Sequence, residues 1–270
     1  MKRILLVATL LFALAGLSWP APIQAQSAPS ASEVAAIRRS AEQGAEQGDS
    51  GDQLLLGSMY YLGNGVAQDY AKAAYWLRKA AEQGDAKAQV MLGEMYHDGT
   101  GVAQDYVQSA NWYRKAAEQG NEYAQRTLGL MYFGGDGVPQ DYTQAANWLR
   151  KAAEQGDAEA QYVLGLLFYK GEGVAQDYAL AANWFRKAAA QGSPPAQEML
   201  GAMYSDGDGM PQDYVLAYAW VNLSASRSGS DDSRKLRNKM AEKLSPEQLG
   251  EAQRLSSNWR KGQSIQREKR

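Results

Sequence analysis

The side chains that most often carry catalysis or bind metals are scarce in this chain. It has a single histidine, His97, and no cysteine. His97 is therefore the one candidate imidazole base for a catalytic triad, and a metal site built from thiolates or from several histidines is excluded. The sequence also lacks the Gly-x-Ser-x-Gly, Ser-x-x-Lys and phosphate-binding loop motifs. We therefore expect no catalytic residues.

Carboxylates do recur, at a spacing that favours a structural role. The triplet Gln-Asp-Tyr appears five times, always 36 residues apart, with its aspartates at Asp69, Asp105, Asp141, Asp177 and Asp213. An aspartate that precedes an amphipathic segment accepts hydrogen bonds from the free amides of a first helical turn. Asp206 and Asp208 with Gly209 resemble part of a calcium loop, but no glutamate follows at the required distance. We therefore expect the repeated aspartates to cap helices and Asp206 and Asp208 to lie in a turn. We expect no bound metal and no cofactor.

The elements that position these residues follow from the same period. A repeat of this length indicates stacked helical hairpins. The five units begin at Leu56, Leu92, Leu128, Leu164 and Leu200. Within one unit, Asp85 is expected to cap a helix over residues 86–96, and Asp105 a second helix that ends at Gly120. The sequence predicts an all-α fold of 36-residue helix-turn-helix repeats.

The repeated pattern LGxMYxxGxGVxQDYxxAxxWxRKAAxQGxxxAQ resembles the Sel1-like repeat, a relative of the tetratricopeptide repeat, over residues 56–228. This resemblance implies a right-handed α/α superhelix, or solenoid, whose concave face is lined by the first helix of each pair. It also implies a non-catalytic scaffold or adaptor that holds a partner protein or peptide on that face. In this family such proteins often act in the cell envelope, as scaffolds, regulators of signalling or partners of cell-wall enzymes.

The flanking segments complete the expected organisation. Residues 1–25 resemble a signal peptide, with Lys2 and Arg3 before an apolar stretch that is shorter than the roughly 20 residues of a membrane span. We expect a periplasmic or secreted protein with no stable span after cleavage, although a retained anchor stays open. The remaining predicted segments are a linker (26–32), an N-terminal capping half-repeat (33–55), C-terminal capping helices (229–261) and a solvated polar tail (262–270).

Balanced charge, with 28 basic and 30 acidic residues, argues against a nucleic-acid partner.

Residues that vary between the repeats mark the candidate binding surface, because constant positions serve the stack. On the predicted first helices the varying positions share one face, which we call the first-helix strip. Its candidate partner-binding residues are Glu94, His97, Tyr123, Arg126, Leu130, Phe133, Tyr162, Leu166 and Tyr169. Apolar and aromatic side chains around an arginine are typical of a binding centre. The alternative is that Phe133, Tyr162 and Leu166 pack against the neighbouring repeat.

Three further interpretations concern aromatic residues and other functions. The tryptophans recur on the constant face, which favours a place in the core over a stacking platform; they are Trp76, Trp112, Trp148, Trp184 and Trp220. Binding of peptidoglycan or another glycan is an alternative function, in which Tyr123 and Tyr162 stack on sugars. A second alternative is an enzyme acting on β-lactams, as linked to cysteine-rich members of the family. The absence of Cys and of Ser-x-x-Lys argues against that activity.

Overall fold

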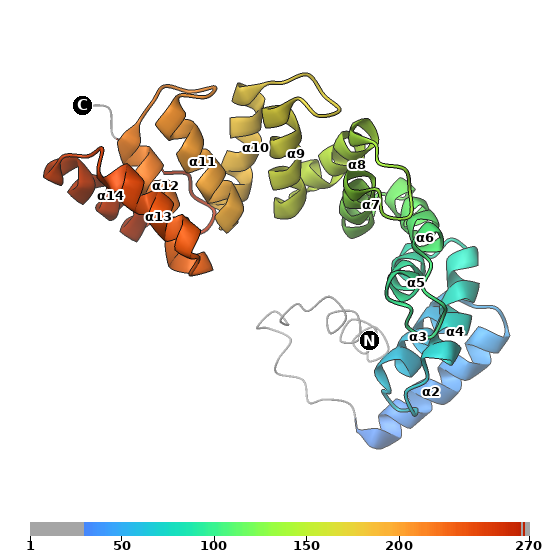
Figure 1. Ribbon diagram of the computed structural model, residues 1–270. Coiled ribbons are helices and arrows are strands. Elements are labelled where there is room, and N and C mark those ends of the chain that lie inside the picture. The colour runs from blue at the N-terminus through green and yellow to red at the C-terminus, as the bar shows by residue number, and fades with distance from the viewer. Residues whose placement is uncertain (1–29, 266, 268–270) are drawn as a thin grey trace. The chain divides into compact units, whose positions relative to one another are not determined.

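The computed structural model describes residues 30–265 and residue 267. Over these residues the chain forms thirteen α-helices and no strand (Figure 1). They divide into two compact units, which we describe separately. Unit 1 ends at Ala124 and also includes Asp136–Val138, and unit 2 holds Gln125–Gly135 and the chain from Pro139 onward. The predicted all-α fold of helical hairpins is confirmed.

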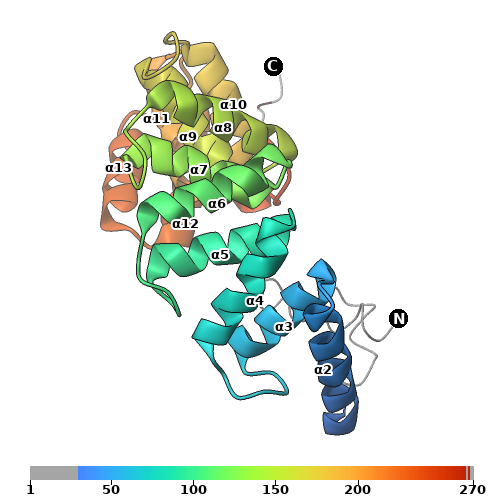
Figure 2. The same cartoon turned by 90° about the vertical axis from the view of Figure 1, so that its right-hand side faces the viewer.

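Unit 1 is built from five helices and the first turn of a sixth. The helices are α2 (Ala31–Glu46), α3 (Ser50–Leu62), α4 (Tyr70–Glu82), α5 (Ala86–Asp98), α6 (Tyr106–Glu118) and the start of α7 (Glu122–Gly134). From α2 to α6, each helix contacts the next along the chain (Figure 2). The N-cap of α2 is Ser30, so the described part of the predicted linker belongs to the start of this helix. Residues 1–25, the predicted signal peptide, lie outside the described residues.

Unit 2 continues the same order and then departs from it. After α7 come α8 (Tyr142–Gln155), α9 (Ala158–Lys170), α10 (Tyr178–Ala190), α11 (Pro194–Asp206), α12 (Tyr214–Ser228), α13 (Asp231–Ala241) and α14 (Pro246–Asn258). From α8 to α13 each helix contacts the next, whereas α14 contacts α12. In the part of the chain that the structure describes, none of the helices is both long and apolar enough to cross a bilayer.

The repeated aspartates cap the helices as predicted. Asp105 accepts a hydrogen bond from the amide of Gln108 at 2.9 Å, and the other four triplets repeat this contact. The first helices end at glycines in the left-handed region, such as Gly99 with φ 71°. The second glycine of each turn meets the preceding repeat, because a Cβ on Gly209 (φ 68°) would clash with the backbone of Tyr178. Glycine is required there by φ and by close approach together.

A buried glutamine joins three helices in repeats of both units, whereas its equivalent in the fifth repeat, Gln197, bonds only to the carbonyl of Ala189. In unit 2 the Gln161 side chain donates to the carbonyl of Ala153 at 3.0 Å and accepts from the Gln191 side chain at 3.0 Å. These contacts link α9 to α8 before it and to α10 after it. The same pair of contacts recurs in unit 1 at Gln53 and Gln89. A buried polar side chain is stable here because both of its functional groups are paired.

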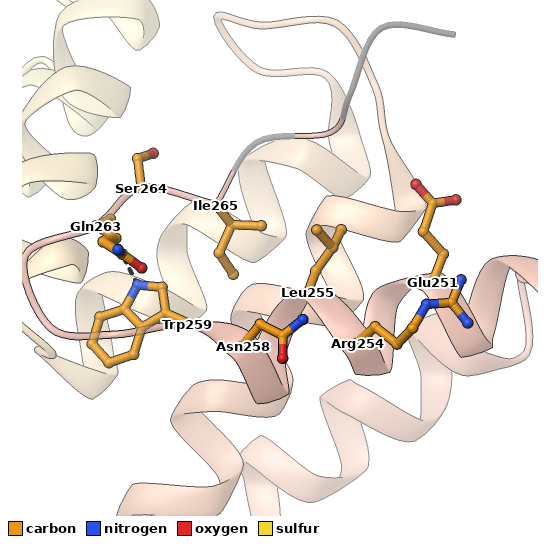
Figure 3. A pocket seen from close by; sticks show the side chains of 8 residues that line it. All are labelled: Glu251, Arg254, Leu255, Asn258, Trp259, Gln263, Ser264 and Ile265. Carbon is orange, nitrogen blue, oxygen red and sulfur yellow. Dashed lines mark hydrogen bonds between the residues drawn. The ribbon is translucent and has the colours of Figure 1, made fainter.

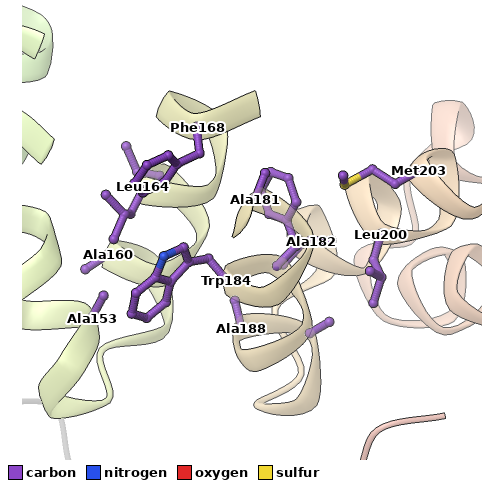
Figure 4. Packing of buried hydrophobic residues seen from close by; sticks show 14 of the residues in the cluster. Ala153, Ala160, Leu164, Phe168, Ala181, Ala182, Trp184, Ala188, Leu200 and Met203 are labelled. Atoms are coloured by element: carbon purple, nitrogen blue, oxygen red, sulfur yellow. The ribbon is translucent and has the colours of Figure 1, made fainter. Parts of the chain in front are cut away.

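The tryptophan series lies in the core only in part. Trp112, Trp184 and Trp220 are buried, and Figure 4 shows Trp184 of α10 against Ala160 and Leu164 of α9. Trp76 and Trp148 are only half-buried, and the ammonium of Lys151 lies 3.9 Å from the centre of the Trp148 ring. The prediction that all five are core residues is therefore confirmed for three positions and in part for Trp76, which packs at the edge of a core cluster, and it is wrong for Trp148.

Part of the described segment that follows α14 (Pro246–Asn258) packs against unit 2. Helix α14 begins with the predicted cap, Ser245, in a capping box. Beyond it, Trp259 and Ile265 are each 6% exposed, and the amide of Gly262 donates to the carbonyl of Ala190 at 2.7 Å. Arg267 forms ion pairs with Asp213 and Glu251 at 3.0 and 2.8 Å. The prediction of a solvated tail is wrong at residues 265 and 267. We call residues 259–265 together with residue 267 the C-terminal strap.

Candidate functional site

In unit 2, the apolar side chains of the first-helix strip are partly packed against the core and partly exposed to solvent. Five of its apolar side chains are half-buried and touch the hydrophobic core of this unit; they are Leu130, Phe133, Tyr162, Leu166 and Tyr169. Tyr162, for example, lies with its ring centroid 5.9 Å from that of the buried Phe185. Packing against the neighbouring helices, the alternative to a binding role, therefore accounts for part of each side chain. The rest remains open to a ligand.

In the first four repeats, a ring near the end of the first helix has a structural partner. The rings of Phe133 and Tyr142 meet edge to face at 5.4 Å, as do Tyr169 and Tyr178 at 5.1 Å. In unit 1, exposed His97 contacts Tyr106 in the same way and shares a 2.7 Å hydrogen bond with Asp98. The tyrosine comes from the Gln-Asp-Tyr triplet, so this pairing explains part of the preference for a ring at the varying position. Comparison of the repeats alone missed this contact.

Arg126 joins two first helices. Its guanidinium lies 3.0 Å from the carboxylate of Glu159 and 3.4 Å from that of Asp157, which also caps helix α9. The Arg126 side chain is 23% exposed. Much of its charge is therefore used within unit 2, where it holds α7 beside α9.

The strip residues of unit 1 form a polar cluster. Burial raises the pKa of Glu94, with Asp98 adding to the effect, while a hydrogen bond from Tyr123 lowers it. Burial beside Glu94 and Tyr123 also raises the pKa of Tyr113. Tyr123 is 41% exposed. Glu94 is thus held inside unit 1, and Tyr123 presents the larger surface to a partner.

The aspartate in the last Gly-x-Gly turn, Asp208, acts as a hydrogen-bond acceptor. The hydroxyl of Tyr169 donates to Asp208 at 2.9 Å, and burial together with this bond raises the pKa of Tyr169 to about 12. Turn chemistry therefore accounts for Asp208. Among the described residues no group of three or more His, Cys, Asp or Glu side chains is placed to hold a metal ion.

Two pockets of unit 2 bear on the candidate site, beside a third of about 210 Å³ whose lining includes Tyr214, Lys243 and Arg267. The larger, of about 340 Å³, lies between α14 and the C-terminal strap (Figure 3). Its lining includes Trp259, whose indole N–H already donates to the carbonyl of Gln263 at 2.8 Å. The smaller, of about 140 Å³, lies between α11 and α13 and is lined by Ala202, Ser205, Asp206, Leu236, Lys239, Met240 and Lys243. Ala202 and Ser205 occupy the positions on α11 that Leu166 and Tyr169 occupy on α9, but this pocket also needs α13, whose position no repeat pattern predicts.

Comparison with known proteins matches the repeat and the fold. The Sel1 repeat family matches the chain five times, at residues 52–85, 86–121, 122–157, 158–193 and 194–228. The structure of c5321, a protective antigen of uropathogenic Escherichia coli displaying an SLR fold, is similar with a TM-score of 0.70 and 36% identity. The match covers 84% of this chain but only 53% of the antigen, so this chain spans about half of its length.

A second solved structure is similar over most of its own length. It is a Sel1 repeat protein from Oxalobacter formigenes, with a TM-score of 0.64 and 38% identity, and the match covers 67% of this chain and 74% of that one. No curated protein matches the chain significantly.

Proposed function

The chain belongs to the Sel1 repeat family, whose members are generally protein-interaction scaffolds, and from this premise we propose that it binds a partner protein or peptide on the first-helix strip. The role proposed is that of a non-catalytic adaptor of the cell envelope. The envelope location rests on the signal-like sequence of residues 1–25. That location predicts a mature chain that begins at Gln26, which N-terminal sequencing of the exported protein tests.

One observation carries the proposal. Leu130 and Leu166 occupy equivalent positions on α7 and α9, where the sister repeats have Glu94 and Ala202. The stack therefore accepts a polar or a small residue at this position, and packing alone does not require leucine. Half-exposed leucines beside half-exposed tyrosines are the composition of an interface centre.

The test uses affinity capture from an envelope extract. The bait is the full chain, compared with a variant carrying Leu130→Ala and Leu166→Ala, changes that copy the alanine of the fifth repeat. A matched control carries Asn147→Ala and Glu154→Ala, two exposed residues of the second helix α8. Circular dichroism first establishes that all three are folded.

Binding on the strip predicts that the parent and the α8 control enrich the same partner and that the leucine variant loses it. Equal capture by all three places the binding surface elsewhere. If no protein is captured and the chain sediments with purified sacculi, glycan binding replaces protein binding as the function.

A further inference from the structure

The small pocket of unit 2 arises from a local change in the repeat. Ala202 stands at the position of Leu130 and Leu166, and Ser205 at the position of Phe133 and Tyr169. These smaller side chains leave space that Leu236 and Met240 of α13 border from the other side. At about 140 Å³ the pocket is smaller than the roughly 300–1,000 Å³ of small-molecule sites. It has room for one side chain of a larger ligand.

The rim of this pocket carries two lysines with no carboxylate partner. Lys235, Lys239 and Lys243 follow one another at four-residue spacing, which places them along one face of α13 and its C-terminal extension. Lys235 pairs with Asp232 at 3.3 Å, but no ion pair within 4.0 Å involves Lys239 or Lys243 in the described part of the chain. Like charges at this spacing destabilise a helix. The C-terminal end of α13 favours a cation at Lys239, but no carboxylate of the described residues relieves the repulsion between Lys239 and Lys243.

The other groups around the two lysines leave the pocket positive. The ammonium of Lys243 lies 4.5 Å from the ring centre of Tyr214 and 3.5 Å from its hydroxyl, a contact that orients the ammonium without neutralising it. Asp206 lines the pocket from α11, so one negative charge faces two positive charges. The lysines thus have positive charge to offer a ligand.

The wider charge distribution agrees with an anionic ligand at this end of the chain. Residues 30–226 carry 24 acidic and 14 basic side chains, a net charge of −10. Residues 227–270 carry 12 basic and 6 acidic side chains, a net charge of +6. The near-neutral total hides this difference in charge, which appears when the chain is divided near the end of the fifth repeat.

We propose that the pocket between α11 and α13 binds an acidic peptide segment of the partner, with an Asp or Glu carboxylate at Lys239 and Lys243 and an adjoining aliphatic side chain against Leu236 and Met240. This assignment rests on the proposed function, because it places one end of the peptide beside the first-helix strip. Bonds from an ammonium to a carboxylate are among the stronger hydrogen bonds in proteins. The apolar wall formed by Leu236 and Met240 favours a ligand with an aliphatic residue next to its acidic residue.

The test pans a phage-displayed library of random linear peptides against the full chain. The pocket predicts an enriched pattern of Asp or Glu beside Leu, Ile, Val or Met. Peptides with this pattern are then measured by fluorescence anisotropy against the parent and two pocket variants. Lys239→Glu with Lys243→Glu reverses the rim charge, and Ala202→Leu with Ser205→Tyr fills the pocket with the residues of the fourth repeat. Each variant is expected to weaken binding by at least about tenfold.

A matched control separates the pocket from general charge. Lys235→Glu changes the charge of α13 outside the pocket and is expected to leave the affinity within about twofold of the parent. If the acidic pattern is enriched but all variants bind equally, the pocket assignment is wrong while peptide binding stands. Enrichment of peptides without acidic residues would likewise show that the pocket assignment is wrong while peptide binding stands. If the parent enriches no peptide, both the pocket assignment and peptide binding on the strip are contradicted.

Discussion

At the scale of single residues, sequence identity between repeats does not produce identical environments. Trp220 and Trp148 occupy the same position in the repeat, yet Trp220 is fully buried whereas Trp148 is half-buried beneath Lys151. Helix α12 is covered by α11, α13 and α14 together, which explains the deeper burial of Trp220. A comparison of repeats identifies which positions are structural, but how deeply each side chain is buried depends on the helices that surround it.

The two tryptophans therefore predict different stabilities. Trp220→Ala is expected to lower the free energy of unfolding by about 3–5 kcal/mol, since it leaves a cavity in the core. Trp148→Ala is expected to cost less, about 1–2 kcal/mol, because part of that ring already faces solvent and Lys151. Urea denaturation followed by circular dichroism measures both. Equal losses would show that the difference in burial has no energetic consequence.

Glu94 gives a prediction with a defined pH dependence. Its pKa is raised by burial, so the folded chain holds the proton more tightly than the unfolded chain does. The stabilisation is thus present below the usual pKa of 4.5 and is lost as the pH rises through the folded value. Glu94→Gln, which is neutral at every pH, is expected to be more stable than the parent at pH 7. This gain should vanish when the pH is lowered below about 4.5.

The control for this measurement is Glu154→Gln, at an exposed position of α8. It should leave the pH dependence of unfolding unchanged. A Glu94→Gln variant that is less stable than the parent at pH 7 would mean that the ionised carboxylate is favoured by its surroundings, with the bond from Tyr123 outweighing burial.

At the scale of helices, the sequence predicts the repeats well and the ends less well. The Asp caps and Gly turns place both helices of a repeat to within about two residues, because each boundary has a local chemical signal. The strap has no such signal. Ile265 and Arg267 lie in a polar sequence, and their burial and pairing depend on α12 and α14. Tertiary contacts of this kind cannot be read from local pattern.

Removal of the strap tests its role. Truncation after Asn258 removes Trp259 and Ile265, both of which pack against the core cluster of unit 2. This deletion is expected to lower the free energy of unfolding by about 3–5 kcal/mol. Arg267→Ala alone is expected to cost less than about 1 kcal/mol, and less still at high salt, since its ion pairs are partly exposed. A truncation with no effect would return the segment to the solvated tail that its composition predicts.

At the scale of the whole molecule, the chain combines a repeating scaffold with surfaces that do not repeat. Family and fold class could be predicted from the 36-residue period, because five copies of one pattern leave few alternatives. The candidate site could be predicted only as a helical face. Its details depend on contacts between helices, such as Arg126 with Glu159 and Tyr169 with Asp208, which join residues from different repeats.

Site-specific photocrosslinking tests binding on the strip most directly. A photoreactive amino acid is placed at position 166 on α9, and in a matched variant at position 147 on α8. Both chains are illuminated with an envelope extract that contains the captured partner. Binding on the first-helix strip predicts a covalent adduct with that partner from position 166 and none from position 147. An adduct from position 147 alone would contradict it and place the partner on the second helices.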